Sequence, residues 1–424
     1  MHNSPEEIVA GHEYLVEEYS YFLDIGLVYP QINTKIWHFF YNIRFACLVS
    51  FVLYVGGWFL RTAVIALSDL SISGIALHVI IIGFVGTGIV LLSYKNRSIF
   101  WEYLIYFNIQ KAQNVAYANN DLDRKLKMER QILKKKICIM WPAYYGIVFA
   151  VLIVLSPIID NCMGMSSPPN ESGNGIAMTL PLPSWTPFDA DHSWTAFFLT
   201  FLFQLAYFAG LAIPWSAGMM FFLENSLLIL DHMKLLINSL QEIDNRAKHL
   251  YEVRYPGRKF DENSKEYDDC YYACLRDSII HYIYLKKSFK MYGQIISFSL
   301  FILFAVGAFS MALAGAHVMS DGPKMTKKVC EIFLVIGEVV LMGMYCVFGE
   351  TFKSKCEEIR DEIYGTQWYN RSAKVRRAIS IFMHMTLNPM VLVAGNLIAI
   401  NLLTFSMTMN SAYSYLNLFY ATQY

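Results

Sequence analysis

The stretch from Ala378 to Tyr424 contains no Asp, Glu, Lys or Arg, yet small polar side chains interrupt it regularly. Uncharged polar groups cost less than charges inside a membrane and can line a water-filled path, which a ring of leucines can close by dewetting. Small and hydroxyl side chains also hold membrane helices together. The pattern therefore predicts either a pore lined by several copies of this helix or a packing face. At helical spacing, one stripe holds Thr404, Met407, Asn410 or Ser411, Ser414, Asn417 or Leu418, and Ala421.

Other kinds of chemistry have less support. The sequence has no HExxH, GxSxG or phosphate-binding loop, so we expect no enzyme activity and no cofactor. Cys270 and Cys274 lie one helical turn apart and could bind a metal with His281, but such a lone pair is usually structural, and we expect no metal site. Glu338 is the one acid near the middle of a span. We favour the interpretation that Glu338 pairs with a neighbour or faces water near a pore wall. The alternative is that it contacts the ligand or the gate.

Membrane helices must position these residues. The chain has 424 residues, of which 55% are hydrophobic and only 16% charged, against about 25% charged in an ordinary soluble domain. The net charge of zero gives no reason to expect nucleic-acid binding. We predict an all-α, polytopic membrane protein with seven transmembrane helices, because a span needs roughly 20 apolar residues. The seven stretches are about 37–60, 74–93, 137–159, 194–223, 291–319, 329–349 and 391–420.

The distribution of Lys and Arg predicts the orientation of the chain. Residues 95–136, 224–290 and 350–390 are rich in Lys and Arg, whereas 160–193 has none. Because these residues favour the cytosol, the N-terminus is predicted to be cytosolic and the C-terminus extracellular. The sequon at Asn170 then lies outside, where glycosylation is plausible. This orientation is opposite to that of G-protein-coupled receptors, and the lack of a detectable repeat argues against a transporter.

A series of short motifs marks the C-terminal third of the chain. They are Glu362-Ile363-Tyr364, Gln367-Trp368-Tyr369, the basic run from Arg371 to Arg377, Asn388-Pro389, Ala394-Gly395, Phe405 and Ala412-Tyr413-Ser414-Tyr415-Leu416. Together with the Gly-Pro segment Leu23–Pro30, this pattern resembles the insect odorant receptor family. Gustatory receptors are similar but tend to end in a TYxxxxxQF run, from which the C-terminus of this chain departs. The characteristic C-terminal sequence of the obligate co-receptor is also absent.

The resemblance implies a tetrameric, odorant-gated, weakly selective cation channel, embedded in the lipid of the plasma membrane of sensory neurons. It implies either a homotetramer or a heterotetramer with an odorant receptor co-receptor. The last helix would line the central pore, with pore or gate roles for Asn410, Ser414, Asn417, Leu418 and Ala421. The expected organisation is a cytosolic segment 1–36, a ligand-binding bundle 37–223, a cytosolic anchor region 224–290, two spans in 291–349, a cytosolic anchor segment 350–390, and the pore helix with a short extracellular tail, 391–424.

The resemblance also places a ligand pocket in the outer half of the second, third, fourth and sixth spans. An apolar, aromatic-lined cavity with few polar groups suits a small volatile organic ligand, bound through burial and shape. Each aromatic residue could instead face lipid or the core, and His78 could instead be a polar group satisfied by its neighbours. With the predicted orientation, the pocket residues are His78, Ile82, Gly146, Phe149, Ala150, Ile153, Phe197, Phe198, Phe201, Leu205, Phe333, Ile336, Gly337 and Val340.

The expected mechanism is a population shift, in which the ligand binds more tightly to the dilated state, where the last helix has moved outward. In that state the Leu418 ring widens and cations pass. A gustatory-type ligand-gated channel and a chemosensory membrane receptor that is not a channel stay open as alternatives.

Overall fold

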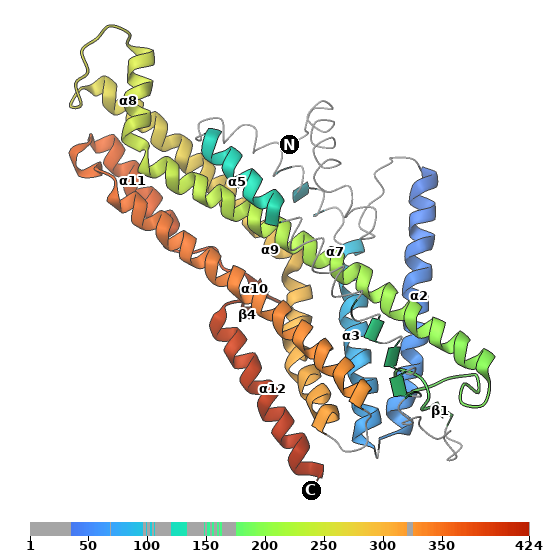
Figure 1. The fold of residues 1–424 in the computed structure, drawn as a ribbon. Helices are drawn as coiled ribbons and strands as arrows, with labels where there is room; N and C mark the ends of the chain where they lie inside the picture. The colour runs from blue at the N-terminus through green and yellow to red at the C-terminus, as the bar shows by residue number, and fades with distance from the viewer. Residues whose placement is uncertain are drawn as a thin grey trace.

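Long helices make up most of the described chain (Figure 1). The computed structural model describes residues 35–67, 69–95, 120–133, 175–319 and 325–423, and the single positions 99, 102, 103, 106, 148, 151, 152, 155, 156, 159, 160 and 162. Its helices are α2 (Lys35–Ile65), α3 (Leu70–Lys95), α5 (Asn120–Leu133), α7 (Trp194–Gln241), α8 (Ile243–Arg254), α9 (Lys265–Met319), α10 (Met325–Gly365), the 3-10 turn η2 (Trp368–Asn370), α11 (Ala373–Thr386) and α12 (Leu402–Gln423). Two short antiparallel hairpins pair β1 (Ile176–Ala177) with β2 (Ser184–Trp185), and β3 (Val393–Ala394) with β4 (Ile398–Ala399).

Several of these helices are long and apolar enough to cross a bilayer. Within the described residues there are 4 such segments: Asn42–Ile65, Trp194–Leu211, Lys265–Met319 and Met325–Asn370. The apolar part of α3, Ile72–Gly88, is shorter. α12 is not among them, because its Ser, Thr and Asn residues lower its hydropathy. The arrangement agrees with the predicted helical membrane fold, while the count of seven and the orientation of the termini stay predictions.

α7 and α9 extend well beyond their predicted spans. Most of region 224–290 is helix, formed by the end of α7, by α8 and by the start of α9. Leu228, Leu236 and Leu240 recur at helical spacing along α7, and all three are buried. The fourth predicted span therefore continues as a helix into region 224–290.

Two buried clusters hold the helices together. The larger one unites α7, α9, α10 and α11 and is rich in aromatic rings. Phe222 on α7, for example, lies edge-on to Tyr345 on α10, with 4.4 Å between ring centroids. The smaller cluster packs α2, α3 and α7 around Phe59 and Tyr207.

The last helix begins at Leu402, later than the predicted residue 391. Residues 393–399 instead form the β3–β4 hairpin, with Gly395 and Asn396 at positive φ in its turn. The backbone N–H of Gly395 is anchored to the carbonyl of Ser297 on α9, at 3.0 Å. The apolar run that resembles the start of a span is therefore a tight turn docked on α9, and the predicted boundary is corrected.

The two ends of the molecule differ in construction (Figure 1). One end carries α8, α11 and the loop at 255–264, and we call it the anchor end. The opposite end carries the β1–β2 hairpin and the last residues of α12, and we call it the hairpin end. The anchor end carries segments that are predicted to be cytosolic, and the hairpin end carries segments that are predicted to be extracellular; the orientation itself stays a prediction.

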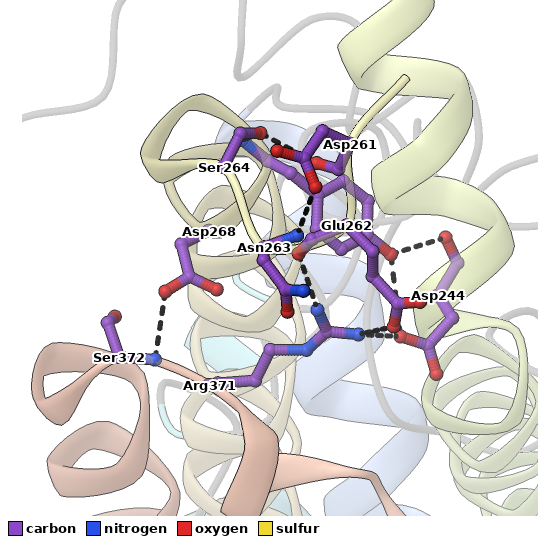
Figure 2. A network of polar contacts seen from close by, with 9 residues as sticks. Asp244, Asp261, Glu262, Asn263, Ser264, Asp268, Arg371 and Ser372 are labelled. Carbon is purple, nitrogen blue, oxygen red and sulfur yellow. Dashed lines mark hydrogen bonds and ion pairs between the residues drawn. The ribbon is translucent and has the colours of Figure 1, made fainter.

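Arg371, just after η2, joins the predicted anchor segments 224–290 and 350–390 (Figure 2). Its guanidinium nitrogen Nη2 donates to Asp244 Oδ1 at 2.9 Å and to Glu262 Oε1 at 3.0 Å. The next residue, Ser372, donates its backbone N–H to Asp268 at 2.8 Å. The connection between α10 and α11 is thus tied to α8, to the 255–264 loop and to the start of α9.

Candidate ligand site and pore face

A buried polar cluster lies where α3, α9 and α10 meet, and we call it the His78 cluster. His78 on α3 is fully buried, with its Nδ1 2.7 Å from Glu331 Oε2 and its Nε2 3.3 Å from Glu338 Oε1, both on α10. Ser310 on α9 donates to Glu338 Oε1 at 3.1 Å. Glu331 and Glu338 are two helical turns apart, so they share one face of α10. These contacts agree with the interpretation that Glu338 pairs with a neighbour and that His78 is satisfied, whereas Glu331 was not anticipated.

The cluster contains more negative than positive groups. His78 can carry at most one positive charge, and it faces two carboxylates. One oxygen of each carboxylate, Glu331 Oε1 and Glu338 Oε2, is shielded from solvent and has no hydrogen-bond partner. Buried acceptors and charges without partners are costly, so this arrangement is stable only if another group or proton supplies the missing donors.

The predicted aromatic residues of α7 point in different directions. Phe197 and Phe201 stack with 6.2 Å between centroids and pack against Leu180 in the loop that contains the β1–β2 hairpin. Phe198 is 59% exposed, and Leu205 is half-buried. Two of the four therefore line the space under this loop, while Phe198 faces outward from the single subunit.

The predicted residues of the other helices are only partly brought together. On α10, Ile336 and Val340 lie on the exposed side, whereas Phe333 and Gly337 are half-buried. Ile82, one turn after His78 on α3, is also half-buried. The remaining predicted positions, Gly146, Phe149, Ala150, Ile153 and the sequon Asn170, lie outside the described residues.

The loop that contains the β1–β2 hairpin is tied to the ends of two helices. The backbone N–H of Trp185 donates to Thr62 Oγ1 on α2 at 2.6 Å. Lys327, in the first turn of α10, donates to the carbonyl of Met178 at 3.3 Å. The loop thus lies over the hairpin end of the bundle, one helical turn from Glu331.

α12 has one packed face and one exposed face. On the packed side, Phe309 of α9 contacts Tyr415 and Phe419, with centroids 6.2 and 5.8 Å apart. Figure 1 shows the helix at the edge of the described structure, against α9 and α10. The exposed side carries all the predicted pore residues, namely Asn410, Ser414, Asn417, Leu418 and Ala421. Among the residues that the structure describes, this stripe has no packing partner, so the packing interpretation gains no support from them.

The hydroxyl groups of this exposed stripe are satisfied along the helix. Ser414 Oγ donates to the carbonyl of Asn410 at 2.9 Å, and Ser411 Oγ donates to that of Met407 at 2.9 Å. The surface is therefore polar without being charged, and its two serine hydroxyls have acceptors within the helix.

Titratable groups at the anchor end are buried in pairs. His281 on α9 contacts His232 on α7 at 3.2 Å, and burial lowers the pKa of His281 to about 4, so it is neutral at pH 7. Within the residues that the structure describes, no group of three or more His, Cys, Asp and Glu side chains could hold a metal ion. The combination of Cys270 and Cys274 with His281 therefore gains no support as a metal site.

Comparison with known proteins identifies related sequences. The profile of the family described as 7tm Odorant receptor matches residues 81–413. Odorant receptor 23a of Drosophila melanogaster is 23% identical over 241 residues, which are 57% of this chain and 59% of the relative. Odorant receptor 2a of the same organism is 23% identical over 236 residues, which are 55% and 58% of the two chains. The matches thus span less than two thirds of the length of these relatives.

Two solved structures share the fold over nearly the whole chain. The insect olfactory receptor OR5 from Machilis hrabei in complex with eugenol matches with a TM-score of 0.74 and 10% identity, covering 98% of this chain and 100% of that one. The structure of OR5 described without eugenol matches with a TM-score of 0.66 and 11% identity, covering 96% and 98%. These likenesses show the fold, and the helix-rich polytopic membrane architecture predicted from the sequence is confirmed.

Proposed function

Because this chain belongs to the insect odorant receptor family, a family of multi-pass membrane proteins and not of enzymes, we propose that it is a subunit of an odorant-gated, weakly selective cation channel. The channel acts in the plasma membrane of sensory neurons. It assembles as a homotetramer or as a heterotetramer with an odorant receptor co-receptor.

The observation that carries this proposal is the exposed, uncharged polar face of α12. Exposed Asn and Ser side chains on a membrane helix are poorly suited to lipid but suit a water-filled path. Four copies of α12 around an axis would turn Asn410, Ser414 and Ala421 toward the ions. Leu418, which is 59% exposed, forms the closing ring, and Asn417 lies beside it.

The ligand in this proposal is a small volatile organic molecule that binds between the helices at the hairpin end. The structurally similar OR5 receptor has been solved in complex with eugenol, which supports a small ligand for this fold. Ligand binding favours the subunit arrangement in which α12 is displaced outward, so that the population of open channels rises. Weak selectivity follows from a pore helix without acidic or basic residues.

The test is whole-cell current in cells that express this chain alone or with a co-receptor, during exposure to volatile ligands. The proposal expects ligand-evoked cation current whose gating or permeability changes in Leu418→Ala. Ile381→Ala is the matched control, because Ile381 is 57% exposed but lies on α11 at the anchor end. Saturable uptake without single-channel events, or ligand binding at the cell surface without current in either condition, would overturn the channel proposal.

A further inference from the structure

His78, Glu331 and Glu338 do not balance one another in charge when both acids are ionised, and the buried Lys327, one turn before Glu331, is engaged with the carbonyl of Met178. With both carboxylates ionised, the cluster is negative even when His78 is an imidazolium. Moving the same protons among His78, Glu331 and Glu338 leaves the net charge of the cluster unchanged. Glu331 is 1% exposed and its Oε1 has no partner among the residues that the structure describes, so a buried acceptor for positive charge lies near the hairpin end of α10.

We propose that this cluster recognises the ammonium group of a small primary amine, and that the ligand class of this receptor therefore includes volatile amines. The inference rests on the proposed function, whose ligand site it defines chemically. Glu338, whose side chain is 13% exposed, meets the ligand first, and Glu331 lies two turns along the same face of α10.

An ammonium group fits this arrangement better than other ligands do. It carries one positive charge and three donors, enough for Glu331 Oε1 and Glu338 Oε2 together. Alkyl amines are protonated at neutral pH, as the ordinary pKa of lysine shows. An alcohol supplies one donor and no charge. A calcium ion requires roughly six to eight oxygen ligands, more than the two free oxygens offer. Leu334 and Val335, both half-buried and on the face of α10 that carries the two acids, leave the rest of the ligand in apolar surroundings.

The first experiment measures binding directly, on the purified full-length receptor in lipid nanodiscs. Thermal unfolding is recorded with 2-phenylethylamine, 2-phenylethanol and propylbenzene, and with hexylamine, hexanol and heptane, which differ within each series only in the terminal group. The amine should raise the unfolding temperature of the receptor at a concentration roughly ten-fold or more below that of its hydrocarbon counterpart. This is the difference in affinity expected for hydrogen bonds to a charged group. Equal midpoints for amine and hydrocarbon in both series would overturn the inference.

Variants separate the cluster from nonspecific binding. Glu338→Gln and Glu331→Gln keep the shape of the side chain and remove its charge, so each should abolish the advantage of the amine but leave the hydrocarbon effect unchanged. The Glu350→Gln variant, changed on the same helix but outside the cluster, should keep the advantage of the amine. An amine advantage that survives in both cluster variants would place recognition elsewhere and overturn the inference.

Current recordings with the same six ligands keep this inference distinct from the proposed function. Amine binding without current would contradict the channel proposal and leave amine recognition standing. Current evoked equally by amine and hydrocarbon would support the channel and refute amine recognition.

Discussion

Replacing Arg371 by Ala should destabilise the anchor end of the molecule more than any exposed charge there would. The Arg371 side chain is 1% exposed and donates to Asp244 and Glu262 at 2.9 and 3.0 Å (Figure 2). Its guanidinium also lies 4.8 Å from the ring centroids of both Tyr267 and Tyr271. Arg371→Ala removes these four contacts, together with the bond from Nη1 to the backbone carbonyl of Glu262 at 3.3 Å, and leaves two acids without their cation.

The expected loss follows from how exposed each partner is. Breaking a fully buried ion pair costs about 3–5 kcal/mol, but Asp244 and Glu262 are 42% and 55% exposed, so water screens both. About 1 kcal/mol for each ion pair is therefore appropriate. Each cation–π contact adds about 0.5–1 kcal/mol. Together these give a destabilisation of about 3 kcal/mol, which is about 6–12 °C in midpoint at the scale known for large domains.

The assay is thermal unfolding of purified receptor, followed by tryptophan fluorescence, for wild type, Arg371→Ala and Lys374→Ala. Lys374 pairs with Asp269 at 3.4 Å and lies 4.0 Å from the ring centroid of Tyr272, but its side chain is 58% exposed and that of Asp269 is 52% exposed, so its removal should cost only about 1 kcal/mol in all. The unfolding midpoint of Arg371→Lys should lie between those of Arg371→Ala and Lys374→Ala, because one ammonium cannot reproduce the planar fork of the guanidinium. Equal midpoints for Arg371→Ala and Lys374→Ala would refute the reasoning that burial sets the cost.

Two further perturbations address other parts of the fold. Gly349→Ala should prevent α10 from docking on the segment after the β3–β4 hairpin and reduce the folded yield, because the new Cβ would overlap the carbonyl oxygen of Ile400. Gly343→Ala should be tolerated, because its Cβ would lie 3.6 Å from the Phe405 ring. Size-exclusion profiles that are the same for the two variants would contradict this packing argument. Burial lowers the pKa of His281 to about 4, so between pH 6.5 and 4 the unfolded chain binds a proton that the folded chain does not, and stability should fall with decreasing pH by up to about 3 kcal/mol. His281→Gln should show a flatter pH dependence of the unfolding midpoint in that window, and an unchanged slope would contradict a neutral buried imidazole.

Local patterns in the sequence predicted the long helices well. Leu228, Leu236 and Leu240 follow helical spacing, and the helix does continue through them. The same reasoning misplaced the start of α12, because hydropathy does not register backbone turns. A turn signal was present, since Gly395-Asn396 separates two short apolar runs in the manner of a hairpin.

The His78 cluster could not be assembled from sequence alone. His78 and Glu338 were each noticed, but 260 positions separate them in the chain, and no local periodicity reports that α3 and α10 pack together. Glu331 was overlooked because it falls at the start of a span, where a charged residue is unremarkable at the membrane interface. Its burial arises from tertiary packing around the first turns of α10, where Lys327 also bonds to the carbonyl of Met178.

α10 connects the proposed ligand cluster with the proposed pore helix. Glu338 faces His78, and about 8 Å further along the helix Gly343 lies against Phe405 of α12. One more turn and a half brings Gly349 against Ile400, just before α12 begins. A rotation or shift of α10 that improves contact with a ligand at Glu338 would therefore move the surface on which α12 rests. Because glycines make both of these contacts, the helices approach closely and little side-chain flexibility is available to absorb such a movement. The coupling between ligand and pore is thus expected to depend on the fit at Gly343, a position where added bulk should alter gating without touching either the ligand cluster or the Leu418 ring.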